Sequence, residues 1–143
     1  MKLQQGDVWL KVSDMKGLKD GKKLDHLVLA EGEATGHRHQ ITSGVAQLIL
    51  LGNKQILQVL SDYAKLHHEE HDVREMLRRK GSFENLSEKD REYLDWVGIE
   101  MKGEFNDFLE QVPREVILKK GTYEYGIVKE FDYDEEELRR VLD

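Results

Sequence analysis

Five of the six histidines in this chain fall into two short clusters, and these clusters are the residues best suited to chemistry. His37 and His39 are separated by one residue, so on a β-strand both side chains point to the same face, with Cβ atoms about 6–7 Å apart. The second cluster, LHHEEH at residues 66–71, adds three imidazoles and two carboxylates. Nitrogen and oxygen ligands without sulfur suit Zn²⁺, Fe²⁺, Mn²⁺ or Ni²⁺ better than Ca²⁺, which prefers oxygen alone. The sequence therefore predicts a site for a divalent transition metal, whose identity it does not specify.

The carboxylates of the second cluster give this site a catalytic hypothesis. Three or four protein ligands would leave an open position at which a metal activates water. Glu69 or Glu70 would then act as an extra ligand or as the general base, which makes a hydrolase the simplest enzyme. Two alternatives stay open: a structural or sensory metal in a non-catalytic binding module, and an interaction protein without metal whose histidines bond to one another and to the carboxylates.

A second pattern overlaps the same cluster. His67, Glu70 and His71 match the HxxEH order of inverted zinc peptidases, in which two histidines one helical turn apart bind zinc. That pattern needs a helix that begins before His67, whereas residues 57–60 resemble a strand. His26 stands alone beside an apolar run, and we expect it at the edge of the core.

The composition narrows the class of protein. The 143 residues fit one domain, and the net charge of −7 opposes a phosphate backbone, which argues against nucleic-acid binding. The absence of cysteine excludes disulfides and thiolate chemistry. The first residues, MKLQQGDVWLKV, lack the apolar core of about 7–15 residues of a signal peptide, and no stretch approaches the roughly 20 apolar residues of a membrane span. We therefore expect a cytoplasmic protein without a membrane partner.

The first third of the chain has the pattern of β-structure. Val8, Leu10 and Val12 alternate with polar residues, and the apolar runs at 45–51 and 55–60 are separated by Gly52-Asn53-Lys54, a plausible hairpin turn.

The middle of the chain is charged and helical, and the end returns to β. Residues 72–112 contain a capping-box pattern at Ser87 and Asp90, and Pro113 follows the last helical stretch. The final third is expected to form strands separated by a turn at Lys119-Lys120-Gly121. If the two β parts pair, the fold is mainly β with a helical insertion at 72–112, and the charged insertion is the surface expected to meet a protein partner.

Four segments together resemble a group of small, mostly uncharacterised bacterial and phage proteins. They are QGDV at 5–8, LAEGEATGHRH at 29–39, LHHEEH at 66–71 and KKGTYEYGIVKEFDY at 119–133. The HxH pair on a strand is also loosely similar to the metal-binding motif of cupins, which are small β-barrels. These resemblances imply a cupin-like barrel or β-sandwich with the metal ligands His37, His39, His68 and His71. They place His67 at a position usually taken by Thr.

Overall fold

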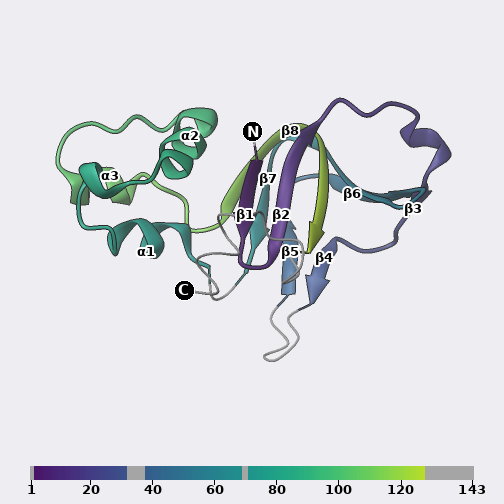
Figure 1. The fold of residues 1–143 in the computed structure, drawn as a ribbon, viewed down its shortest axis with the longest axis horizontal. Coiled ribbons are helices and arrows are strands. Elements are labelled where there is room, and N and C mark those ends of the chain that lie inside the picture. Colours follow the sequence, from purple (N-terminus) through teal and green to yellow (C-terminus); the bar gives the residue numbers. More distant parts are fainter. Residues whose placement is uncertain (1, 32–37, 69–70, 128–143) are drawn as a thin grey trace, which may run out of the picture.

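The structure is a computed structural model that describes residues 2–31, 38–68 and 71–127. Its β-strands are β1 (Lys2–Gln5), β2 (Val8–Ser13), β3 (Lys22–Lys23), β4 (Val28–Glu31), β5 (Arg38–Ser43), β6 (Ala46–Leu51), β7 (Lys54–His67) and β8 (Val116–Ile127). The helices are α1 (Val73–Arg78), α2 (Glu88–Val97) and α3 (Phe105–Glu110), with short 3-10 turns at Leu18–Asp20 and Phe83–Asn85. Figure 1 shows the helices gathered beside the sheet.

All pairings within the sheet are antiparallel, and its main path runs β1-β2-β8-β7-β5-β4. The long strand β7 pairs with β8 along one edge, and along the other edge with β6 in its first half and β5 in its second half. The N-terminal and C-terminal β parts therefore pair with each other, as the sequence predicts. The predicted hairpin between the two apolar runs is also present, with Gly52 and Asn53 as the turn.

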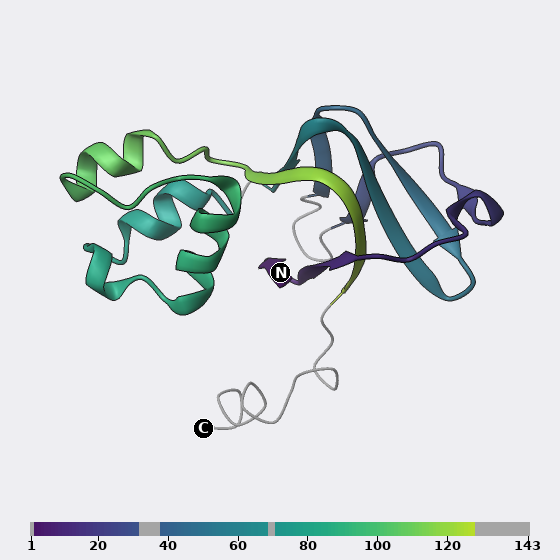
Figure 2. The ribbon, with the colours of Figure 1, turned by 90° about the horizontal axis from the view of Figure 1, so that it is seen from above.

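The turn expected at Lys119-Lys120-Gly121 is wrong, because β8 runs through it without interruption. Gly121 has φ +150° and pairs with Val59, next to a register shift between Val59 and Tyr63 of β7. A glycine inside a strand marks a bend as often as a turn, and its freedom at positive φ lets β8 follow the bent neighbour. Figure 2 shows the resulting curve of β8.

The predicted fold class, mainly β with a helical insertion, is confirmed, but a cupin-like barrel is not. Within the described residues β1 and β4, at the two ends of the strand path, do not pair, so the sheet is not closed. Buried apolar residues of β2, β4, β5, β6, β7 and β8 form the main core. None of the helices in 2–31, 38–68 and 71–127 is long and apolar enough to cross a bilayer.

The three helices follow β7 and precede β8 along the chain, and they have a small core of their own. Its buried members are Leu77, Leu86, Leu94, Phe108, Leu109 and Val112. The predicted capping box begins α2, since the Ser87 hydroxyl accepts from Asp90 N–H and the Asp90 carboxylate accepts from Ser87 N–H. One contact joins the helices to the sheet, because the Tyr93 hydroxyl of α2 accepts from the Ile117 N–H of β8 at 2.8 Å. A second joins the two ends of the insertion, where Val73 N–H donates to the carbonyl of Arg114, just before β8, at 2.7 Å. The second contact closes the base of the insertion just after His71.

Candidate functional site

Three of the predicted histidines lie together at one end of the sheet. The ring centroid of His68 is 4.0 Å from that of His39 and 4.7 Å from that of His71, and the His39 and His71 centroids are 6.5 Å apart. His39 and His68 are buried, with 1% and 8% of their surface exposed, whereas His71 is partly exposed. We call these three residues the histidine cluster. It joins two segments that are about 30 residues apart in the sequence.

The pairing of β5 with β7 brings the cluster together. Gln40 lies opposite His67 and Ile41 opposite Leu66, so β5 runs beside the last residues of β7. His39 points to the same face as Ile41, toward the core, because side chains alternate along a strand. Beyond β7, His71 N–H donates to the His68 carbonyl at 3.1 Å. The ring of His71 lies on the side of the sheet that carries His39, since both rings approach Gly6.

The hairpin between β1 and β2 adds two polar side chains that the sequence analysis did not include. The Gln5 side chain, 2% exposed, places its Oε1 2.8 Å from His39 Nδ1, and its Nε2 donates to the Leu66 carbonyl at 3.0 Å. Asp7 Oδ1 lies 3.1 Å from His39 Nε2. Both ring nitrogens of His39 therefore face side chains of one hairpin, Gln5 from the end of β1 and Asp7 from the turn. The sequence signal for these two residues is the QGDV segment at 5–8, in which an amide and a carboxylate flank a glycine.

Gly6, the first residue of this turn, packs directly against the histidine cluster. Its φ of +58° is in the region that favours glycine, as expected at the first position of a two-residue hairpin turn. A Cβ at this position would lie 2.7 Å from His71 Nε2 and 3.2 Å from His39 Cε1. The absence of a side chain at position 6 therefore keeps the space between these two rings open.

The environment of His39 favours the neutral ring. Burial and the neighbouring His68 lower the pKa of His39 to about 4, although the nearby Asp7 carboxylate acts in the opposite direction. At neutral pH the ring is therefore unprotonated at one nitrogen, which is the form of imidazole that binds metals.

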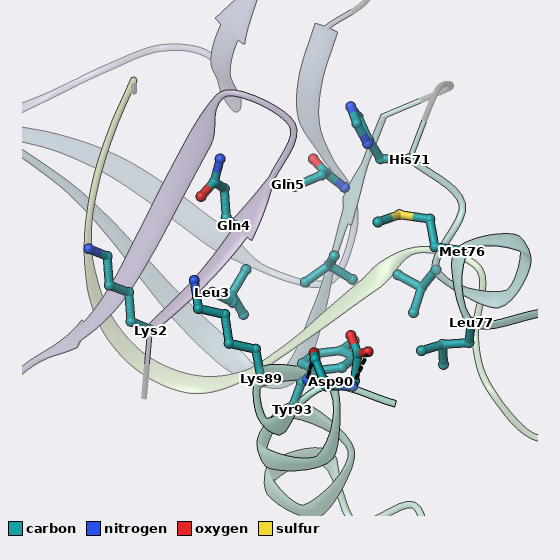
Figure 3. A pocket seen from close by; sticks show the side chains of 13 residues that line it. Lys2, Leu3, Gln4, Gln5, His71, Met76, Leu77, Lys89, Asp90 and Tyr93 are labelled. Atoms are coloured by element: carbon teal, nitrogen blue, oxygen red, sulfur yellow. Dashed lines mark hydrogen bonds between the residues drawn. The ribbon is translucent and has the colours of Figure 1, made fainter. Parts of the chain in front are cut away.

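A largely apolar pocket of about 220 Å³ adjoins the cluster, between β1 and the helices α1 and α2. Its apolar wall is formed by Leu3, Val73, Met76, Leu77, Tyr93 and Val116. Figure 3 shows His71 and Gln5 at one end of the pocket and Asp90 and Tyr93 at the other. A small molecule in this pocket would contact the exposed side of the histidine cluster.

The remaining predicted site residues have different positions. His37, Glu69 and Glu70 lie outside the described residues, so their predicted roles stay predictions. Across 2–31, 38–68 and 71–127, no group of three or more His, Asp or Glu side chains is arranged to hold a metal ion. His26, expected at the core edge, is exposed, and its Nδ1 accepts from Val28 N–H.

The inverted-peptidase pattern is wrong for this chain. His67 is the last residue of β7, and the next helix, α1, begins only at Val73. His67 and His71 are therefore not one turn apart on a helix, and His71 instead lies beside the rings of His68 and His39.

The lowered pKa of His39 predicts a pH-dependent stability of the metal-free protein. Between about pH 4 and 6.5 the unfolded chain binds a proton that folded His39 does not, so stability falls as the pH falls through this range. Between pH 7.5 and 5 we expect the free energy of unfolding to lose about 2 kcal/mol from this residue. Urea denaturation in the presence of a chelator measures the loss, and His39→Gln should lack that part of it. An equal decline in the variant would contradict the assignment to His39.

Gly6 and Gly52 offer a matched pair for testing the crowding beside His71. Both have φ near +60°, but a Cβ at Gly52 meets nothing within 4 Å. Gly6→Ala and Gly52→Ala should thus cost a similar backbone strain of about 1–2 kcal/mol. Only Gly6→Ala should displace the ring of His71, which the imidazole resonances in ¹H–¹³C NMR spectra report. Unchanged His71 resonances in Gly6→Ala would show that the described contact is absent.

Comparison with known proteins adds a family but no activity. No curated protein and no solved structure matches the chain significantly. Residues 4–84, more than half of the chain, match a family described as a domain of unknown function, DUF8820. The match includes the β1–β2 hairpin from Gln4 onward and the whole histidine cluster. The chain therefore belongs to the DUF8820 family.

Proposed function

We propose that this protein binds a divalent transition metal at the histidine cluster. The observation that carries the proposal is the convergence of His39, His68 and His71 from two distant segments. The ring centroid of His68 lies 4.0 Å from that of His39 and 4.7 Å from that of His71. The His39 ring is neutral at neutral pH, because burial and the neighbouring His68 lower its pKa to about 4. Neutral imidazoles from two chain segments are the usual ligands of Zn²⁺, Ni²⁺ and Fe²⁺.

Metal binding requires a local adjustment of the cluster. The His39 and His68 rings are stacked with an interplanar angle of 25°, and stacked rings do not direct their nitrogens to one point. Rotation of the His68 or His71 side chain would redirect a nitrogen toward His39. The chain also holds His37 two residues from His39, and Glu69 and Glu70 between His68 and His71, so further predicted ligands are close in sequence. A metal would exchange the stacking of the rings for coordination bonds.

The pocket beside His71 favours catalysis as a second candidate function. A structural metal needs no cavity, because its protein ligands close the coordination shell. Here a pocket of about 220 Å³ with an apolar wall reaches His71, which is only partly buried. A small substrate in this pocket would be within reach of an open metal position, with Glu69 or Glu70 as the general base of a hydrolytic reaction. A closed site in a non-catalytic binding module remains the alternative that the experiments below distinguish.

Metal binding is tested with protein purified without a histidine tag. We expect about one Zn²⁺ per chain by elemental analysis and by calorimetric titration, and an affinity lower by about 100-fold or more in His39→Ala and in His71→Ala. His71 is partly exposed, so its variant should keep the fold even if the buried His39 variant does not. The control is His26→Ala, which removes an exposed histidine outside the cluster. Full binding by His71→Ala, or none by the unsubstituted protein, would contradict the proposal.

An open coordination position is tested with Co²⁺ in place of Zn²⁺. If the site is catalytic, azide should bind the metal and change the visible absorption of the Co²⁺ protein, because a small anion can occupy the open position. Replacing the pocket residue Leu3 by Trp should weaken azide binding while Co²⁺ stays bound. A spectrum that does not respond to azide would indicate a closed shell and a structural metal.

A further inference from the structure

The orientation of the Gln5 side chain follows from the carbonyl it contacts. The Leu66 carbonyl can only accept a hydrogen bond, so the group 3.0 Å from it must be the Gln5 amide nitrogen. The Gln5 oxygen is then directed at His39 Nδ1, 2.8 Å away. The Gln5 amide is 2% exposed, and within the described contacts it bridges the end of β7 and the ring of His39.

This orientation decides which nitrogen of His39 carries the proton. The Gln5 oxygen is an acceptor, so His39 Nδ1 must donate, and a neutral ring then has its lone pair on Nε2. Metal-binding histidines are oriented in the same way, since the nitrogen that does not bind the metal donates to a neighbouring acceptor. The ring is therefore prepared to bind a cation through Nε2.

The side chain that faces Nε2 is also an acceptor. Asp7 Oδ1 lies 3.1 Å from His39 Nε2, and in the Nδ1–H tautomer of the neutral ring both of these atoms are acceptors and potential metal ligands. Two ligand atoms that each lie about 2.0–2.2 Å from one metal ion are about 2.8–3.1 Å apart at the right angles of octahedral geometry and about 3.3–3.6 Å apart at the tetrahedral angle. The observed separation therefore fits a pair of ligands on a common ion.

We infer that Asp7 is a metal ligand that binds the same ion as His39 Nε2, and that Gln5 is a positioning residue that sets the tautomer and orientation of His39. This inference rests on the proposed metal binding and adds two residues to it from a third chain segment. The Asp7 side chain is 51% exposed, so the site would open to solvent on the side of the β1–β2 turn. His68, whose ring centroid lies 4.0 Å from that of His39, and His71, across Gly6 from His39, are the described candidates for further ligands.

The inference is tested by comparing Asp7→Asn with Asp14→Asn, which removes an exposed carboxylate outside the site. We expect Zn²⁺ affinity to fall by about 100-fold or more in Asp7→Asn, as for the cluster histidines, and to stay unchanged in Asp14→Asn. If Asp7→Asn binds Zn²⁺ normally while His71→Ala does not, Asp7 is not a ligand, and its contact with His39 Nε2 is only a hydrogen bond. The inference then fails, but the proposed function stands. If the unsubstituted protein binds no Zn²⁺, the proposed function fails and the inference fails with it.

The role of Gln5 needs a readout that a general loss of structure does not produce. In Gln5→Leu we expect Zn²⁺ affinity to fall by about 10–100-fold, as for other residues that orient a ligand. The ¹⁵N shifts of the His39 ring in the metal-free protein should show the Nδ1–H tautomer in the unsubstituted chain and its loss in Gln5→Leu. An Nε2–H tautomer in the unsubstituted protein, or an unchanged tautomer in the variant, would overturn the role given to Gln5.

Discussion

The pairing of β5 with the second half of β7 is the constraint on which the rest of the site depends. Because Gln40 lies opposite His67, the buried His39 of β5 lies beside His68, the residue that follows β7. A slip of one residue would turn His39 to the opposite face of the sheet, away from the core. The bend of β7 and β8 near Val59 supports this pairing, because it lets one long strand pair with β6 first and with β5 afterwards.

The β1–β2 hairpin supplies the polar side chains that contact His39. Its three consecutive residues Gln5, Gly6 and Asp7 contribute an amide, a position without a side chain and a carboxylate, and each contacts the histidine cluster. A buried polar side chain costs free energy unless it is bonded, and Gln5 meets that requirement with the Leu66 carbonyl and His39. The hairpin therefore connects the stability of the sheet with the orientation of a single ring. The adjoining pocket places this ring system next to a space for a small molecule.

Much of the fold could be predicted from the sequence, because alternation, turn residues and helix caps are local signals. Strand β2, the hairpin at Gly52 and the cap at Ser87 follow from such signals. The uninterrupted course of β8 could not be predicted, since Lys-Lys-Gly has the composition of a turn and only pairing with bent β7 keeps it extended.

At the site, residue types predicted the gathering of His39, His68 and His71, whereas the contributions of Gln5 and Asp7 depend on a contact between distant strands. The most direct test of the account is anomalous diffraction at the zinc edge from crystals grown with one equivalent of Zn²⁺. It predicts a single peak about 2.0–2.2 Å from both His39 Nε2 and Asp7 Oδ1. A crystal without a peak in the cluster, or with zinc only at His26 or His67, would contradict it.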